Sequence, residues 1–454
     1  MILFEFIKKC IYMLKALVGW GFILTFETQK NKIKKMFTDP LYGNSLYLIF
    51  TNVFGTGSGF FFWVFAAKLY SSEQVGLAVA LISCMSLISM FSMLGLDIGI
   101  IRYLPNANDK NQMINSCITI ISIVSILLCI LFLAGLNIFS PSLNFLSNNF
   151  YYMILFILFT VAYSIFYMQI NIFSAFRHSK YSMLQTLFSV LRVVILPLIV
   201  MYGFLGMYLS YGIGILVACI LGNYYVSKIN KNYKFKLNFN KDMLKEMFNY
   251  SIKNYISAIF EGTPNYFLPI LIINILGAKQ NAYFYIAWSF SAFFQMVARS
   301  TSISLLVEGS NKESSIKKDI IHSIKFIYSI LLPVIVLVYF FGKYVLLIFG
   351  EEYSENSFGL FMILAISSIP YTINILYISV KRIQQRLNSV VLMHSFLGLF
   401  SIVLSIFFAK WMGVIGVGIS WLLVNCIASL FVWRELFNYQ DLQPKKLREI
   451  FNKK

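Results

Sequence analysis

Two charged side chains lie inside long apolar runs of this sequence and could bind a charged ligand. Arg192 falls within the run 183–202, and Glu261 falls within the run 255–276. Runs of this length suit a membrane, where a buried charge is costly unless it is paired or faces a polar cavity. The planar guanidinium of Arg192 matches phosphate oxygens and stays charged at any physiological pH. Arg192 is therefore a candidate binding residue for an anionic substrate.

Glu261 has three interpretations that the sequence leaves open. It can hold Arg192 while the site is empty, take a proton or sodium ion as a coupling group, or form a static ion pair with Arg192 that joins two halves of the molecule. Arg299, late in another apolar run, completes the predicted substrate-binding set. Asp97 and Arg102 flank the inner end of an apolar run. They are candidates for a cytoplasmic gate or for an entry site for the anionic substrate, with simple anchoring at the membrane surface as the alternative.

Helix-breaking residues interrupt two of the apolar runs at matched positions. Gly55, Gly57 and Gly59 lie in one run, and Gly262 and Pro264 lie in another, with an offset of 207 positions from Gly55 to Gly262. Paired broken helices at corresponding places in two halves point to the central site of a transporter. We therefore predict helix breaks at these five residues, lining a cavity.

The sequence contains no recognisable catalytic or metal-binding pattern. Its six cysteines are scattered singly, and its three histidines are too few for a histidine-based metal site. It has no phosphate-binding P-loop, zinc-protease motif or serine nucleophile elbow. We expect no catalytic residues, no bound metal and no cofactor. Coupling of the protein's activity to protons or sodium ions is the one ion dependence that we expect.

The composition is that of a membrane protein. The 454 residues are 59% hydrophobic and 12% charged, whereas soluble domains are about 45–50% apolar and about 25% charged. A net charge of +19 would suggest a nucleic-acid partner for a soluble protein. Here the basic residues lie between apolar runs, so membrane topology and anionic lipids explain them and no nucleic-acid partner is expected.

Twelve apolar runs have the roughly 20 residues that a helix needs to cross the hydrocarbon layer. They are 45–67, 75–96, 114–136, 150–173, 183–202, 204–226, 255–276, 282–305, 326–349, 358–380, 389–409 and 412–433. If the first run starts in the cytoplasm, 32 Lys and Arg residues lie in inner segments and four lie in outer segments. This imbalance predicts that both termini are cytoplasmic.

Short patterns recur along the chain at a nearly constant offset, which indicates an internal duplication. Gly203 and Gly206 recur as Gly413 and Gly416, 210 residues later. We predict two six-helix halves that form a parallel repeat. The predicted organisation is an amphipathic, basic cytoplasmic segment (1–39), an N-lobe (40–226), a basic cytoplasmic linker (227–250), a C-lobe (251–437) and a basic cytoplasmic tail (438–454). An extra membrane helix within residues 1–26 is the alternative for the first segment.

Several stretches resemble a known family. They are PLYGNS at 40–45, GFFFWVFAAKLYSSEQVGLAVALIS at 59–83, GLDIGIIRYLP at 95–105, LIFGEEY at 347–353 and Lys381-Arg382. These stretches resemble the polysaccharide or lipid-linked oligosaccharide flippases of the O-antigen type. That family belongs to the superfamily that also contains the multidrug and toxic-compound extruders. The resemblance covers residues 40–435 and carries no fixed site residues with it.

The resemblance implies an all-α polytopic membrane protein with about twelve transmembrane helices. They would form two pseudo-symmetric six-helix lobes around a central cavity that opens alternately to either side. Its substrate would be a polyprenyl-diphosphate-linked oligosaccharide, the repeat unit of O-antigen, capsule or another surface polysaccharide. The protein would move this unit from the inner to the outer leaflet of the cytoplasmic membrane. Expected partners are membrane lipids and the polymerase and assembly proteins that use the flipped unit.

Two other functions remain open on the sequence alone. A cation-coupled multidrug exporter would share the fold, but the arginines favour an anionic substrate over a cationic drug. A membrane polysaccharide polymerase or glycosyltransferase would need a large outer loop, whereas the outer segments here, such as 276–282 and 409–412, are very short. We therefore expect a transporter and not an enzyme.

Overall fold

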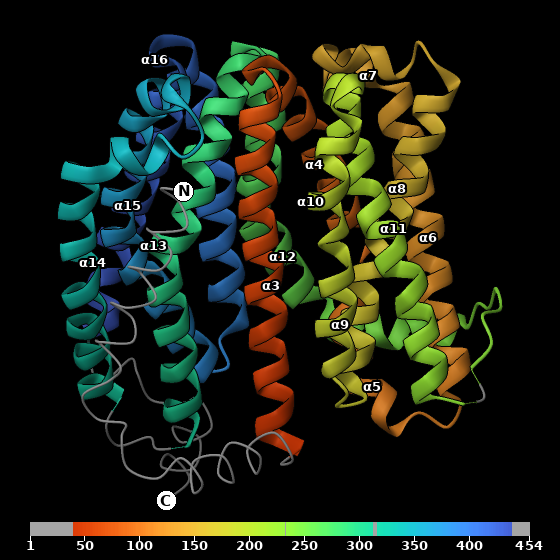
Figure 1. The fold of residues 1–454 in the computed structure, drawn as a ribbon. Coiled ribbons are helices and arrows are strands. Elements are labelled where there is room, and N and C mark those ends of the chain that lie inside the picture. Colours follow the sequence, from red (N-terminus) through yellow and green to blue (C-terminus); the bar gives the residue numbers. More distant parts are fainter. Residues whose placement is uncertain (1–39, 232, 312–315, 438–454) are drawn as a thin grey trace, which may run out of the picture.

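The computed structural model describes residues 40–231, 233–311 and 316–437. Every regular element within these ranges is a helix, as the sequence predicts (Figure 1). The first half contains α3 (Pro40–Leu69), α4 (Ser72–Ser92), α5 (Leu96–Tyr103), η1 (Leu104–Asn106), α6 (Lys110–Ala134), α7 (Leu136–Phe139), η2 (Pro141–Leu146), α8 (Phe150–Ala175), α9 (Lys180–Ser189), α10 (Leu191–Ile195), η3 (Leu196–Tyr202) and α11 (Gly203–Ile229). The second half contains α12 (Lys241–Leu276), α13 (Ala278–Asn311), α14 (Ile316–Leu346), α15 (Glu351–Ile383) and α16 (Leu387–Phe437). The predicted terminal segments 1–39 and 438–454 lie outside the described residues.

Ten helical segments of the described chain are long and apolar enough to cross a membrane. Two of them, Lys180–Ile229 and Leu387–Leu436, have 50 residues each. At ~1.5 Å per residue, such a segment is more than twice the ~30 Å of hydrocarbon that one span crosses. Each of the two folds back at a glycine, Gly203 in the first and Gly413 in the second. Counted as two spans each, they bring the total to the twelve that the sequence predicts.

Gly203 and Gly413 make these two reversals with nearly the same backbone conformation. Gly203 has φ 57° and ψ −139°, and Gly413 has φ 62° and ψ −144°. Residues other than glycine rarely adopt these angles. Three residues later the chain passes so close to itself that a Cβ on Gly206 would lie 2.3 Å from the Ile199 carbonyl oxygen. The equivalent conformations, 210 residues apart, support the predicted repeat.

The helices form two groups that meet along the middle of the molecule. In Figure 1 the group from α4 to α11 lies on one side and the group from α13 to α16 lies on the other, with α3 and α12 between them. The groups contact each other chiefly where α4 packs against α12 and α13. We call the two ends of this bundle the α5 end and the α7 end, after the short helices that lie there (Figure 1).

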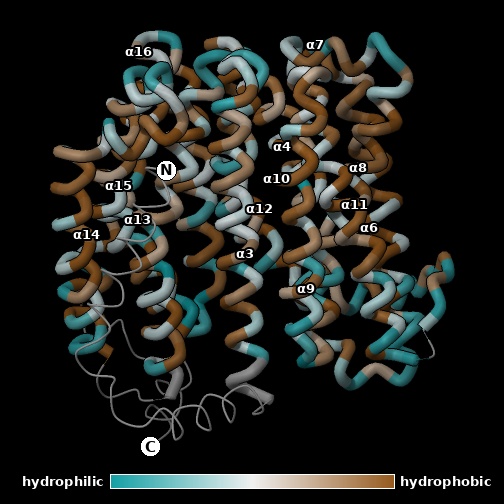
Figure 2. Tube along the Cα trace, viewed as in Figure 1, coloured by the Kyte–Doolittle hydropathy of each residue, from teal (hydrophilic) through white to brown (hydrophobic). Residues whose placement is uncertain are grey.

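Hydrophobic residues cover the outside of the helices between the two ends. Figure 2 shows brown, apolar stretches along the middle of the outer helices and more hydrophilic residues toward both ends. Large apolar side chains such as Leu131, Phe340 and Phe431 are exposed on the outside of the protein. This pattern is expected when lipid rather than water surrounds the middle of the bundle.

The predicted helix breaks are absent, because α3 and α12 are continuous through them. Pro264 removes the hydrogen bond that the Phe260 carbonyl would accept within α12. Helix α16 approaches that carbonyl closely, since a Cβ on Gly398 would lie 2.4 Å from the Phe260 oxygen. Gly262 likewise allows a close contact, because a Cβ there would lie 2.6 Å from Met90 Sδ. The glycines and proline thus mark close helix packing instead of interrupted helices.

The connection between the halves is shorter than the predicted linker 227–250. Helix α11 continues to Ile229, and α12 begins at Lys241, where the Asn240 side chain accepts a hydrogen bond from the Met243 N–H at 3.1 Å. Part of the connection is held against α6, since the Lys234 carbonyl accepts a hydrogen bond from Asn115 Nδ2 at 2.9 Å. Helical structure therefore extends into the predicted linker from both sides.

Candidate functional site

A branched cavity lies in the middle of the bundle, between the two helix groups. Its three parts have volumes of about 330, 320 and 430 Å³, and we call them the glutamate chamber, the arginine chamber and the polar chamber. Tyr163 lines all three parts, so they adjoin one another. The lining residues come from α4, α5, α8, α9, α10 and α11 of one group, from α13 of the other, and from α3 and α12 between them. The cavity thus has the central position that the predicted architecture requires.

Arg192 lines the arginine chamber and has no carboxylate partner in the described part of the chain. Helix α10 holds it with 6% of its surface exposed, and its Nη2 donates to Ser58 Oγ at 2.8 Å. Nη2 also lies 3.4 Å from the Gly55 carbonyl oxygen, and the guanidinium carbon lies 4.8 Å from the Tyr211 ring centroid. Among the described residues, no Asp or Glu oxygen lies within 4.0 Å of it, and its Nε is buried without a hydrogen-bond partner. Its positive charge is therefore solvated only by neutral dipoles.

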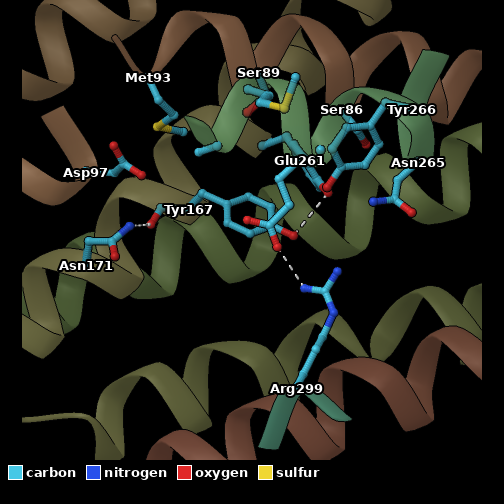
Figure 3. Close-up of a pocket in the computed structure, with 14 residues that line it drawn as sticks. Ser86, Ser89, Met93, Asp97, Tyr167, Asn171, Glu261, Asn265, Tyr266 and Arg299 are labelled. Carbon is cyan, nitrogen blue, oxygen red and sulfur yellow. Dashed lines mark hydrogen bonds and ion pairs between the residues drawn. The ribbon is translucent and has the colours of Figure 1, made fainter. Parts of the chain in front are cut away.

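Glu261 pairs with Arg299 and not with Arg192, which corrects the ion pair considered from the sequence. Glu261 Oε1 lies 3.0 Å from Arg299 Nη1, and the two side chains meet in the glutamate chamber (Figure 3). Glu261 Oε2 lies 3.9 Å from Nε2 of the buried His394, whose Nδ1 is 2.7 Å from Ser257 Oγ. The pairing follows from the fold, because α12 and α13 are antiparallel neighbours and bring residues 38 positions apart together.

The predicted helix-break residues differ in their relation to the cavity. Gly55 and Gly59 line the arginine chamber, and Gly262 lines the glutamate chamber. A Cβ on Gly59 would lie 3.9 Å from Arg192 Nη2, so the absence of a side chain leaves space beside the guanidinium. Gly57 faces open space, and Pro264 is buried within the bundle.

Asp97 and Arg102 lie at opposite ends of the short helix α5 and are not joined. Asp97 lines the glutamate chamber, whereas Arg102 is exposed in the last turn. Burial raises the pKa of the Asp97 carboxyl, and hydrogen bonds from backbone N–H groups at the start of α5 offset this only in part. The structure thus brings Asp97, but not Arg102, to the cavity with Glu261 and Arg299.

Five tyrosines form a group that sequence reasoning did not identify. This tyrosine cluster comprises Tyr163, Tyr167, Tyr211, Tyr266 and Tyr285. Its members come from α8, α11, α12 and α13, and each lines at least two parts of the cavity. Figure 3 shows Tyr167 and Tyr266 beside Glu261. The sequence gives no signal for them, because a tyrosine within an apolar run faces lipid as readily as a cavity.

The cavity offers no metal site of the usual kind. Within the described ranges, no three His, Cys, Asp or Glu side chains come together in a way that could hold a metal ion. Its charged groups are Arg192, Asp97 and the Glu261–Arg299 pair, and the rest of its lining is neutral. Such an arrangement can hold an anion and hydrogen-bond a polar ligand.

Comparisons with known proteins support the predicted fold. A model of the family described as polysaccharide biosynthesis protein matches residues 41–301. No curated protein sequence matches the chain. Among solved structures, the lipid II flippase MurJ in an inward closed conformation matches with a TM-score of 0.67 and 15% identity, over 88% of each chain.

Two further solved structures belong to the MOP superfamily by their descriptions. An inward-facing multidrug resistance transporter of the MATE family matches with a TM-score of 0.60 and 15% identity, over 87% of this chain and 94% of the other. A transporter from Pyrococcus furiosus matches with a TM-score of 0.56 and 15% identity, over 88% and 96%. At these identities the likeness concerns the fold. These three relatives are described as transporters or flippases and not as enzymes, in line with the sequence-based expectation for this chain.

Proposed function

This chain belongs to the polysaccharide biosynthesis protein family, and from this premise we propose that it is a flippase for a lipid-linked glycan. Its substrate would be a polyprenyl-diphosphate-linked oligosaccharide, the repeat unit of O-antigen, capsule or another surface polysaccharide. The protein would carry it from the inner to the outer leaflet of the cytoplasmic membrane by alternating access, with both termini in the cytoplasm. Polymerase and assembly proteins would then use the flipped unit.

The state of Arg192 is the observation that carries this proposal. A guanidinium buried at mid-span without a counter-charge is costly, and the cost is recovered when an anion binds. Its Nε has no hydrogen-bond partner among the described residues, and Gly59 leaves space beside Nη2. A diphosphate offers several charged oxygens to a guanidinium, with hydrogen bonds that are stronger than those between neutral groups. These features suit Arg192 to bind an anionic headgroup.

The Glu261–Arg299 pair supplies a second cationic group that a diphosphate can compete for. The pair faces the cavity, with 42% of the Arg299 side chain and 32% of the Glu261 side chain exposed. A diphosphate carries more negative charge than one carboxylate, so it can displace Glu261 from Arg299. The released carboxylate would then take up a proton or a sodium ion, which would couple transport to an ion gradient.

Leaflet exchange in proteoliposomes tests the function. The probe is a polyprenyl-diphosphate oligosaccharide, and the proteins are the wild type, Arg192→Ala, Arg192→Lys and the control Arg434→Ala. Arg434 is exposed in the last turn of α16, away from the cavity. A charge-assisted hydrogen bond contributes about 1.5–3 kcal/mol, so we expect Arg192→Ala to slow exchange by roughly 10- to 100-fold. Arg192→Lys keeps the charge and should retain part of the rate.

Two results would count against this proposal in different ways. Exchange that requires the protein but is unchanged in Arg192→Ala would keep the flippase and remove Arg192 from substrate binding. Absence of exchange by the wild type, across several glycan lengths and under imposed proton and sodium gradients, would contradict the flippase itself. Efflux of lipophilic cations by the same proteoliposomes would then indicate a multidrug exporter.

A further inference from the structure

We infer that the tyrosine cluster and the polar chamber form the glycan subsite of the cavity and accept uncharged sugars. In this arrangement Arg192 holds the diphosphate while the first sugars lie against tyrosine rings and side-chain amides. The inference rests on the proposed function, since it identifies where the glycan half of that substrate binds. Four features of the cavity support it.

The polar chamber adjoins the arginine chamber. Tyr211 lines both, and its ring centroid lies 4.8 Å from the Arg192 guanidinium carbon. Tyr285 also lines both chambers and packs against Trp63, with ring centroids 4.8 Å apart. A group attached to an anion at Arg192 therefore enters the polar chamber between these two tyrosines.

The lining of the polar chamber has the chemistry that a sugar requires. Its fourteen lining residues include only two aliphatic ones, Ile82 and Ala292. The others are four tyrosines and a tryptophan, four serines, two amides and Arg299. Hydroxyl and amide groups hydrogen-bond sugar hydroxyls, while aromatic rings offer apolar faces to the C–H side of a sugar ring. A polyprenyl chain or a lipophilic drug would leave most of these polar groups unsatisfied.

Packing fixes several of these groups before any ligand binds. Trp288 Nε1 donates a hydrogen bond to Asn265 Oδ1 at 3.1 Å, which orients the amide (Figure 3 shows it beside Tyr266). Tyr163 packs edge-on against Tyr167 with ring centroids 4.8 Å apart, and the two hydroxyls lie 3.3 Å from each other. Rigid aromatic side chains lose little conformational freedom when a ligand binds. The subsite is thus organised in advance.

The charge of the polar chamber favours uncharged sugars. Arg299 is the only charged residue among the described residues that line it, and while the diphosphate is bound at Arg192 the Glu261 carboxylate, 3.0 Å from Arg299, offsets that charge. An acidic sugar would have to give up its hydration without gaining a free cation. Hexoses and N-acetylated hexosamines face no such cost. We therefore expect the sugars nearest the diphosphate to be uncharged.

Substrates that differ only in the glycan test this subsite. We would compare polyprenyl diphosphates that carry one uncharged sugar, an uncharged oligosaccharide, or an oligosaccharide of equal length with uronic acids. The variants are Tyr285→Leu and Tyr266→Leu, chosen over Tyr211 because the Tyr211 ring lies against the Arg192 guanidinium, with Tyr285→Phe to keep the ring. Tyr339→Leu is the control, because Tyr339 is exposed on α14. Thermal unfolding of each purified variant checks that it has folded.

We expect the variants to lose exchange rate to an extent that depends on the glycan. A contact with one aromatic side chain changes binding by about 2- to 10-fold, so each Leu variant should slow exchange of the uncharged oligosaccharide by about that factor. Exchange of the single-sugar substrate should fall less, and Tyr339→Leu should change neither. The wild type should move the uncharged oligosaccharide faster than the acidic one. Equal rates in the wild type and the Leu variants would overturn the glycan subsite while leaving the flippase intact.

A measurement of direct sugar binding tests the subsite independently of transport. Saturation-transfer NMR would follow the free, lipid-less oligosaccharide with detergent-solubilised wild type and Tyr285→Leu. Saturation of the sugar protons that weakens in Tyr285→Leu supports the subsite, even if no leaflet exchange occurs. Equal saturation in both proteins, or none in either, overturns it.

Discussion

The two arginines of the cavity carry the same charge but differ in their surroundings. Arg192 is buried and bonded to neutral oxygens of α3, whereas Arg299 is partly exposed and paired with Glu261. Arg299 also lies over the Tyr371 ring, with its guanidinium carbon 5.7 Å from the centroid. An incoming anion meets an available charge at Arg192 but must compete with a carboxylate at Arg299. Arg192 is thus suited to holding a ligand, and Arg299 is suited to exchanging one.

Replacing Glu261 with glutamine should uncouple transport from its driving ion. Glu261→Gln cannot release or bind a proton, and it leaves Arg299 without a counter-charge. We expect glycolipid exchange in proteoliposomes to lose its dependence on an imposed ion gradient, and release of the diphosphate to become slower. Glu355→Gln, at an exposed position of α15, is the control. If the gradient dependence of Glu261→Gln matches that of the wild type, Glu261 serves only to pair with Arg299.

Lys381 should stabilise the second half of the protein through a buried ion pair. Its side chain is 2% exposed and binds Glu435, whose other oxygen accepts a hydrogen bond from Tyr377 at 2.9 Å. Removing one partner of a buried pair costs about 3–5 kcal/mol, and the partial exposure of Glu435 lowers this to about 1–3 kcal/mol. Lys381→Met should therefore lower the unfolding temperature in detergent. The double variant Lys381→Met, Glu435→Gln should recover part of the loss, and a strictly additive double variant would contradict the pairing.

At the scale of elements, two helical hairpins depend on glycine at their tips. Gly203 and Gly413 adopt positive φ where the chain reverses. Two non-glycine residues, Arg177 and Gln385, adopt positive φ at the other ends of the same hairpins. The hairpins therefore have matched turns in the two halves. The turns at Gly203 and Gly413 restrict the residue type more strongly, because residues other than glycine rarely adopt positive φ with ψ near −140°.

Alanine at Gly413 should destabilise the protein through backbone strain alone. A Cβ at this position would meet no atom within 4 Å, so the whole cost comes from the backbone angles, about 1–3 kcal/mol. Gly57→Ala is a matched control, since Gly57 is also free of neighbours within 4 Å but lies inside the helix α3. There the change should be neutral or stabilising by about 0.5–1 kcal/mol. Thermal unfolding of the two variants should shift in opposite directions, and equal shifts would contradict the role of Gly413.

For the whole molecule, the sequence predicted spans and charges better than contacts. Run length and hydrophobicity show the helices, and a charge such as Arg192 within a run is visible because it violates that pattern. The partner of Glu261 was not visible, because Arg299 reaches it only through the packing of two helices. The predicted break at Pro264 is wrong for the same reason, since the close approach of Gly398 to the Phe260 carbonyl exists only in the folded bundle.

The two helix groups are in direct backbone contact at the α7 end. A Cβ on Gly76 of α4 would lie 1.7 Å from the Ala278 carbonyl oxygen of α13, and Asn281 Nδ2 donates to the Gly76 carbonyl at 2.8 Å. Nearby, Glu352 accepts a hydrogen bond from Ser72 at 3.1 Å and pairs with Lys279 at 3.0 Å. Alternating access requires these contacts to separate and re-form. Gly76 is therefore the point at which a side chain would hold the groups apart.

Leucine at Gly76 should shift the protein toward a state that is open at the α7 end. The 1.7 Å spacing leaves no room for even one carbon, and the neighbouring atom is backbone that cannot rotate away. Spin labels on cysteines placed at the exposed positions Glu73 and Glu355 should report a longer distance across this end in Gly76→Leu than in the unsubstituted background. Glycolipid exchange should slow as well, because one half of the transport cycle becomes costly. Gly57→Leu, in open space on α3, should change neither quantity. If Gly76→Leu leaves the label distance unchanged, the α4–α13 contact is not the closure on which transport depends.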